Sequence, residues 1–213
     1  MSNLGLAILY EVLNRRQDIA AERVYAPWTD MEEEMRKRKM PLFSLETKTE
    51  IAAFDFVGFS LQYEMIYTNV LNMLDLAGIP LYAKDRGEDM PFIVGGGPCV
   101  YNVEPVADFF DFFIVGEGEE AIVEVSDAFM AWKKAGRPGG RKGFLRRLLS
   151  ADGIYVPSFY EPEYDEEGHY KALRPLAEAA KPVIYKRVIR DMDDAISVEH
   201  PIVPYMDIVH NRI

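Results

Sequence analysis

Two glycine-rich segments are the residues of this sequence best suited to holding a ligand. The first is Phe-Ile-Val-Gly-Gly-Gly-Pro at residues 92–98, and the second is Phe-Phe-Ile-Val-Gly-Glu-Gly-Glu-Glu-Ala-Ile at residues 112–122. Glycine lacks a Cβ, so such turns adopt backbone conformations closed to other residues and let a ligand come close to the main chain. The candidate binding residues are therefore Gly95, Gly96 and Gly97 in the first loop and Gly116, Glu117, Gly118 and Glu119 in the second.

Each loop follows a short apolar run that is typical of a strand buried on both faces. Open α/β sheets bind ligands at the carboxyl ends of neighbouring parallel strands, which is where we expect both loops. Each loop also has a purely structural interpretation. The triple glycine could serve only a tight turn, and the acids of the second loop could serve only the positive end of a helix dipole. Both interpretations stay open.

A third apolar run, residues 54–61, ends in Ser60 and Leu61. Its serine hydroxyl could donate to a ligand or satisfy a backbone group at the strand end. The glycine spacing at 95–97 differs from the spread glycines of the dinucleotide-binding fingerprint.

Other chemistry is poorly represented. The single cysteine, Cys99, has no histidine near it in sequence, and one thiol cannot hold an iron–sulfur cluster. The three histidines, His169, His200 and His210, lack the spacing typical of metal ligands. We assign no catalytic residue and no metal site, and we assign no acid–base role to Asp108 or Asp111.

Composition excludes several classes of function. A net charge of −11 over 213 residues disfavours nucleic-acid binding, which requires a basic face. A hydrophobic content of 49% supports a real core. Because no apolar run is long enough to span a membrane and no secretory leader is present, we expect a cytoplasmic protein without membrane contact.

The elements that position these loops alternate along the chain. Hydrophobic periodicity and capping residues predict helices over 4–13, 30–39, 63–77, 119–135 and 141–149. Strands are predicted over 23–27, 54–61, 79–82, 92–94 and 112–115. Extended segments at 153–157, 159–161 and 169–173 surround a turn at 165–168, and one more strand is predicted over 183–190.

This order predicts a flavodoxin-like, doubly wound parallel α/β sheet over residues 1–136, with a small β-rich extension over 137–213. A doubly wound domain normally begins with an inner strand, whereas this sequence begins with a helix. We therefore expect a fragment of a longer protein that lacks its first strand. The unpaired neighbours of that strand should pair with residues 153–190 or cause self-association of the fragment.

Taken together, the two glycine loops resemble the amino-terminal, cobalamin-binding-type domain of radical S-adenosylmethionine (radical SAM) proteins. In that family a Gly-Gly-Pro loop follows the fourth strand and a Gly-Glu-Gly-Glu loop follows the fifth. Residues 56–61, Phe-Val-Gly-Phe-Ser-Leu, resemble the third strand, and residues 102–108 resemble the linking segment of an uncharacterised branch.

The resemblance implies that the candidate residues Ser60, Leu61, Gly95–Gly97 and Gly116–Glu119 would contact a corrin. It also implies that a downstream radical SAM domain of the same polypeptide would hold S-adenosylmethionine and a four-iron cluster. That domain would carry out a radical methylation or sulfur insertion. The family's three-cysteine loop is absent here, so this chain is not expected to be catalytic alone.

The Asp-x-His-x-x-Gly segment that supplies the lower cobalt ligand is absent too, so histidine-ligated cobalamin is not expected. One alternative is a ligand-free docking domain that keeps the fold. A second is a flavodoxin-like response or phosphate-binding module, which predicts an acidic cluster or a hydroxyl-rich loop after the first strand that this sequence does not contain.

Overall fold

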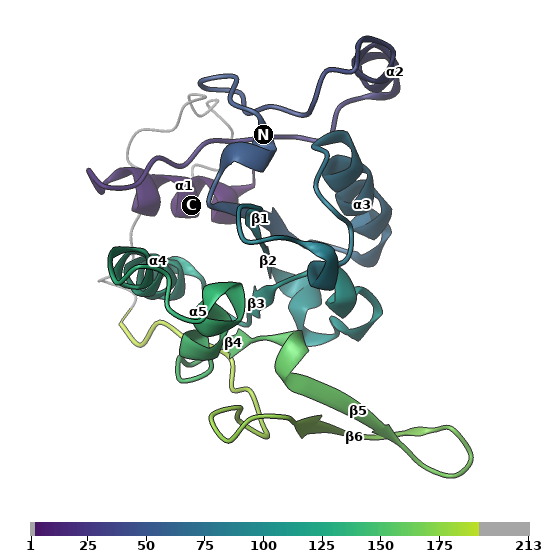
Figure 1. Cartoon of the computed structure of the whole chain (residues 1–213), viewed down its shortest axis with the longest axis vertical. Coiled ribbons are helices and arrows are strands. Elements are labelled where there is room, and N and C mark those ends of the chain that lie inside the picture. Colours follow the sequence, from purple (N-terminus) through teal and green to yellow (C-terminus); the bar gives the residue numbers. More distant parts are fainter. Residues whose placement is uncertain (1–2, 192–213) are drawn as a thin grey trace, which may run out of the picture.

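The structure, a computed structural model, describes residues 3–191. A four-stranded sheet with the order β1–β2–β3–β4 forms its centre (Figure 1). The strands are β1 (Phe56–Ser60), β2 (Phe92–Gly96), β3 (Phe112–Ile114) and β4 (Ile154–Tyr155). The first three are parallel, as predicted, and β4 is antiparallel to β3. The chain is thus a mixed α/β protein with a mostly parallel sheet, while its specific likeness to flavodoxin stays a prediction.

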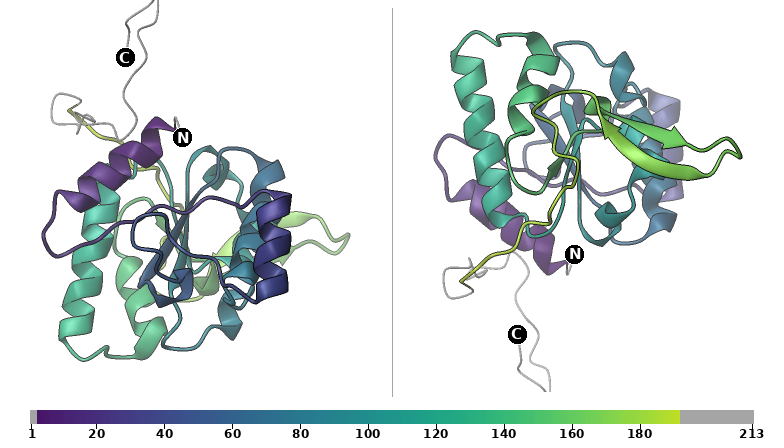
Figure 2. Two further views of the ribbon diagram at one scale, coloured as in Figure 1. Left: turned by 90° about the horizontal axis from the view of Figure 1, so that it is seen from above. Right: turned by 90° about the horizontal axis from the view of Figure 1, so that it is seen from below.

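Five helices cover the two faces of this sheet in the described part of the chain. They are α1 (Leu4–Asn14), α2 (Thr29–Arg38), α3 (Tyr67–Leu76), α4 (Glu119–Lys134) and α5 (Gly140–Leu148). Figures 1 and 2 show α1, α4 and α5 on one side of the strands and α2 and α3 on the other. All five agree with the predicted helices, although η2 (Glu64–Ile66), a short 3-10 turn, precedes α3. None of the helices within residues 3–191 has the length and apolar character needed to cross a membrane.

An aromatic cluster joins the sheet to α4 and α5. Its members are Phe56, Phe92, Phe129, Trp132 and Phe144, with neighbouring ring centroids 4.7 to 6.3 Å apart. Such edge-to-face and tilted contacts stabilise a core beyond the area that they bury. Because Phe144 lies on α5, this helix packs with the main sheet, although it follows the predicted boundary at residue 136. The division into two domains stays a prediction.

A hairpin extends from the sheet beyond β4. It consists of β5 (Tyr160–Tyr164) and β6 (Tyr170–Pro175), which are antiparallel. The Asp165 carboxylate accepts hydrogen bonds from the backbone N–H groups of Glu167 and His169, closing the predicted turn. The predicted β-rich segment is therefore confirmed for these strands.

Three of the predicted strands are wrong. Residues 23–27 and 79–82 form no strand, and residues 183–190 form only an isolated bridge, from Arg187 to Gly116. At the first site, Arg23 donates from its backbone N–H to Glu46, and its carbonyl accepts from Leu45 in a loop contact. At the second site, the carbonyls of Pro80 and Leu81 accept from the Arg86 side chain. At these two sites, hydrogen bonds to side chains and to a loop take the place of pairing with a neighbouring strand.

β1 forms one edge of the sheet, and within residues 3–191 no strand pairs with its outer side. Gly58, in the middle of β1, is exposed, and a Cβ built there would meet no atom of the described residues within 4 Å. β4, from the predicted extension, pairs with β3 at the opposite edge. Self-association through the free edge stays a prediction.

Candidate functional site at the carboxyl edge of the sheet

Both glycine loops lie at the same edge of the sheet. β2 pairs in parallel with β3, with Gly95 opposite Phe113, so the turns that follow these strands are neighbours. The predicted strand 92–94 is longer than expected, because Gly95 and Gly96 are its last residues and only Gly97 of the triple glycine lies in the turn. β1 also ends here, with Ser60 opposite Gly96. The prediction that the two loops follow adjacent parallel strands is confirmed.

The chain itself occupies the space beside two glycines of the first loop. A Cβ at Gly95 would lie 2.4 Å from the Phe113 ring, and one at Gly97 would lie 3.0 Å from the Leu61 carbonyl oxygen. Gly97 has a φ of 97°, a conformation that favours glycine. Main-chain bonds hold this loop, because Leu61 donates to Gly96 at 2.7 Å and Cys99 donates to Leu61 at 3.0 Å. Close packing of the chain therefore accounts for the need for glycine at these two positions.

Gly96 differs from its neighbours, because a Cβ there would meet no atom of residues 3–191 within 4 Å. The hydroxyl of Ser60, its partner across the ladder, accepts a hydrogen bond of 2.6 Å from the Gln62 side chain. Leu61 is fully buried, so its side chain contributes to the core. Ser60 and Gly96 are partly exposed and Gln62 is exposed, so these three residues are open to a ligand.

The second loop is covered by a segment from much later in the sequence. A Cβ at Gly116, where φ is 99°, would lie 2.2 Å from the Arg187 carbonyl oxygen. The Glu117 carboxylate accepts a hydrogen bond from the backbone N–H of Ile189. Gly118 caps α4, and Glu119 lies in its first turn, where an acid interacts favourably with the helix dipole.

Sequence reasoning missed two residues at this edge. Arg187 packs against the second loop, and the opposite charges of the distant segments 117–120 and 186–190 were the sequence signal that could have indicated the contact. Tyr67, at the start of α3, has a buried hydroxyl without a hydrogen-bond partner among residues 3–191. Burial, with a smaller contribution from the neighbouring Cys99, raises the pKa of Tyr67, which therefore stays neutral at physiological pH.

Three large side chains are exposed at the same edge. Tyr63 and Met65 follow β1, and Tyr101 follows β2 in η4 (Pro98–Tyr101). Their exposed fractions are 54%, 83% and 64%, respectively. We call these three residues the apolar rim. Grouped exposed apolar side chains are typical of surfaces that contact another protein or domain.

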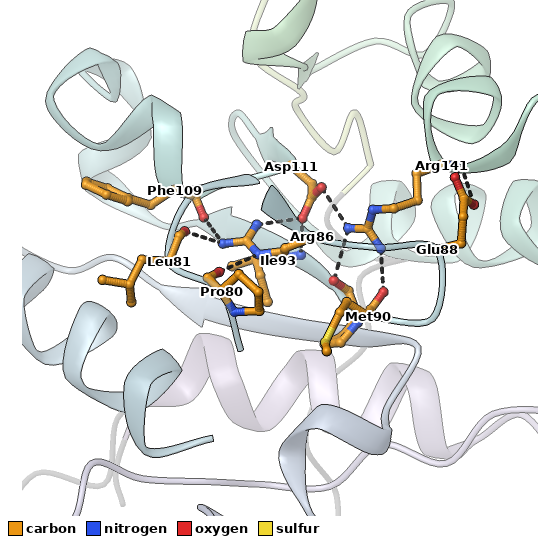
Figure 3. Close-up of polar contacts among 10 residues, drawn as sticks. Pro80, Leu81, Arg86, Glu88, Met90, Ile93, Phe109, Asp111 and Arg141 are labelled. Carbon is orange, nitrogen blue, oxygen red and sulfur yellow. Dashed lines mark hydrogen bonds and ion pairs between the residues drawn. The ribbon is translucent and has the colours of Figure 1, made fainter. Parts of the chain in front are cut away.

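A buried charge cluster lies where β2 and β3 begin, at the other ends of these strands from the glycine loops (Figure 3). The Asp111 carboxylate, immediately before β3, accepts hydrogen bonds of 2.9 Å from both Arg86 and Arg141. It also accepts a bond of 2.8 Å from the backbone N–H of Ile93 in β2. Asp111 therefore ties the starts of β2 and β3 together.

The two arginines of this cluster use their other donors on backbone carbonyls. Arg86 binds the carbonyls of Pro80, Leu81 and Phe109, and Arg141 binds those of Met90 and Pro91. Burial lowers the pKa of Arg86, but an arginine starts so high that it stays charged. With its donors paired inside the protein, the cluster organises loops rather than presenting a reactive group.

The comparisons with known proteins identify the family of this chain. The family described as "Radical SAM proteins, N-terminal" matches residues 5–157, well over half of the chain. The chain belongs to this family. The match ends just beyond β4, so it includes both glycine loops and the buried charge cluster.

A relative is an uncharacterized protein of Methanocaldococcus jannaschii, 36% identical over 122 residues. The match covers 56% of this chain and 24% of the relative, so the chain spans about a quarter of that protein's length. No solved structure matches the chain at a significant level.

The side chains present do not fit the iron–sulfur cluster that the family name implies. The whole sequence contains one cysteine, and Cys99 is buried. Within residues 3–191, no group of three or more His, Cys, Asp or Glu side chains is placed to hold a metal ion. No step of radical chemistry can therefore be assigned to residues of this chain.

Proposed function

We propose that this chain is a non-catalytic positioning domain of a longer radical SAM protein, docked against the catalytic domain of the same polypeptide. The observation that carries the proposal is that Gly95, Gly97 and Gly116 pack against the chain's own atoms. Loops closed in this way serve packing and leave little open backbone for a large flat ligand. The match to the radical SAM N-terminal family supports the identity of the larger protein.

The proposed docking face is the apolar rim at the carboxyl edge. Tyr63, Met65 and Tyr101 expose apolar area that a monomeric domain gains nothing by exposing. In the full protein, S-adenosylmethionine and a four-iron cluster would be held by the other domain, in the cytoplasm. The reaction would be a radical methylation or sulfur insertion.

Hydrogen exchange tests this docking. We expect the backbone amides of residues 63–66 and 98–101 to exchange at least about tenfold more slowly in the full-length protein than in the 213-residue chain, because docking closes them to water. A Met65→Asp/Tyr101→Asp double variant of the full-length protein should lose this protection. Trp28→Asp, a control at an equally exposed residue at the start of α2, should keep it. Equal exchange in the two proteins would contradict the proposal.

A second candidate function is corrin binding at the open part of the same edge. It is favoured by the space beside Gly96 and by the Tyr67 hydroxyl, which is buried without a hydrogen-bond partner in the described part of the chain. The corrin would rest on Gly96 and approach Ser60, with the second loop at its far side.

Titration of the chain with hydroxocobalamin, followed by visible absorption, tests this candidate. A spectral change that is lost in Gly96→Val and kept in Gly87→Val would support it, because both glycines have open space for a larger side chain. No spectral change in the unmodified chain would exclude corrin binding and would leave the docking proposal standing.

A further inference from the structure

The second glycine loop has a specific partner within the chain. Residues 185–189, which we call the strap, lie across the loop at the end of β3. We propose that the Gly-Glu-Gly-Glu motif is a docking site for this strap. Its role is then to fix the point from which the polypeptide leaves the α/β domain. This inference does not depend on what the apolar rim or Gly96 binds.

Backbone pairing is the first part of the contact. Arg187 donates from its N–H to the Val115 carbonyl at 2.8 Å, and its own carbonyl accepts from the Glu117 N–H at 3.1 Å. The two bonds flank Gly116 and form a parallel bridge. Any side chain at Gly116 would collide with the Arg187 backbone, and on the other side a Cβ built at Gly153 would lie only 3.1 Å from the Arg187 Cβ. The strap can therefore lie this close to the loop only because positions 116 and 153 are glycine.

Charge pairing is the second part. The Arg187 guanidinium donates to Glu120 at 3.0 Å and to Glu124 at 2.9 Å, both on the first turns of α4. Residues four apart on a helix lie on the same face, so the two carboxylates form one clamp. The Arg187 side chain is only 16% exposed, and its bonds to Glu124 and Glu120 raise its pKa. Charge-assisted bonds of this kind are stronger than neutral ones.

The strap itself has the pattern of a half-buried strand. Arg187 and Ile189 are partly buried, whereas Lys186, Val188 and Arg190 are exposed. This alternation is typical of a strand with one face against the protein. The Ile189 N–H also donates to the Glu117 carboxylate. Gly116, Glu117 and Glu120 therefore each have a separate contact with the strap. The strap is drawn in yellow-green in Figure 2, where it runs close to α4.

Limited trypsin digestion of the full 213-residue chain tests the proposal, because Lys186 is itself a cleavage site. Gly116→Ala and the double variant Glu120→Gln/Glu124→Gln should each speed cleavage at Lys186 by about tenfold or more, since a protease cleaves the opened form. Gly118→Ala is the matched control, because Gly118 has a negative φ and a Cβ there would meet only the tip of Leu9. Its cleavage rate should stay within about twofold of the unmodified chain.

Melting temperature and circular dichroism separate strap release from unfolding. If Gly116→Ala unfolds the whole chain, the double glutamine variant, which leaves the backbone unchanged, decides the question. The proposal is overturned if the unmodified chain is cut at Lys186 as fast as at the exposed Lys171 of the hairpin. It is also overturned if neither set of variants differs from Gly118→Ala. Either failure would leave the docking proposal intact, because that proposal is tested at Met65 and Tyr101.

Discussion

The buried charge cluster around Asp111 allows a quantitative prediction about stability. Asp111→Asn keeps the shape of the side chain and removes its charge. In the unmodified protein the side chains of Arg86, Asp111 and Arg141 are 0%, 3% and 9% exposed, so water cannot replace the lost carboxylate. The substitution leaves two buried guanidinium groups without a counter-charge and places an amide N–H₂ against one of them.

The expected cost follows from the contacts that are lost. Removing one partner of a buried ion pair costs about 3 to 5 kcal/mol, because the remaining charge stays buried and uncompensated. Whole domains of this kind are stable by about 5 to 15 kcal/mol, so the loss is a large share of the total. For a chain of this length, each kcal/mol corresponds to about 2 to 4 °C. We therefore expect the melting temperature to fall by about 6 to 20 °C.

Urea unfolding and thermal melting of the 213-residue chain measure this effect. Asp108→Asn is the matched control: Asp108 is exposed and only three residues away, so its free energy of unfolding should change by less than about 0.5 kcal/mol. A loss of under about 1 kcal/mol in Asp111→Asn would refute the reasoning, because it would mean that the cluster is solvated or that its charges are not coupled.

Two further predictions concern the sheet. Tyr155 donates to Glu104 at 2.6 Å, and burial, followed by this bond, raises the pKa of its phenol. The stability that the neutral Tyr155 phenol contributes should therefore be complete below about pH 10 and fall as the pH rises further. Tyr155→Phe should lower the free energy of unfolding in urea by about 1 kcal/mol at pH 7, and this free energy should then decline less steeply at alkaline pH than in the unmodified chain. Gly95→Ala should cost about 1 to 3 kcal/mol in the same assay, because its Cβ would lie 2.4 Å from the Phe113 ring, whereas Gly96→Ala has open space. Equal stability of the two alanine variants would contradict the packing explanation for Gly95.

Local signals in the sequence were sufficient for the helices and for three parallel strands. Asn3, for example, caps α1 by accepting a hydrogen bond from the Leu6 N–H, as a polar residue before an apolar helix indicates. The apolar runs before the glycine loops predicted β2 and β3 as neighbouring buried strands. These features depend on residues that are close in the sequence, which is why they can be read from it.

The contacts of the two loops are made by residues that are distant in the sequence, so they could not be predicted from it. Gly95 is explained by Phe113, and Gly116 by Arg187, but a glycine looks the same in a sequence whether a ligand or the chain fills the space beside it. Residues 79–82 had the composition of a strand, yet Arg86 takes the carbonyls of Pro80 and Leu81.

The sequence alone determined where backbone freedom is available, because that property belongs to each glycine by itself. Only the tertiary structure decided what uses that freedom, because the side chains and backbone that fill the space are brought there by folding.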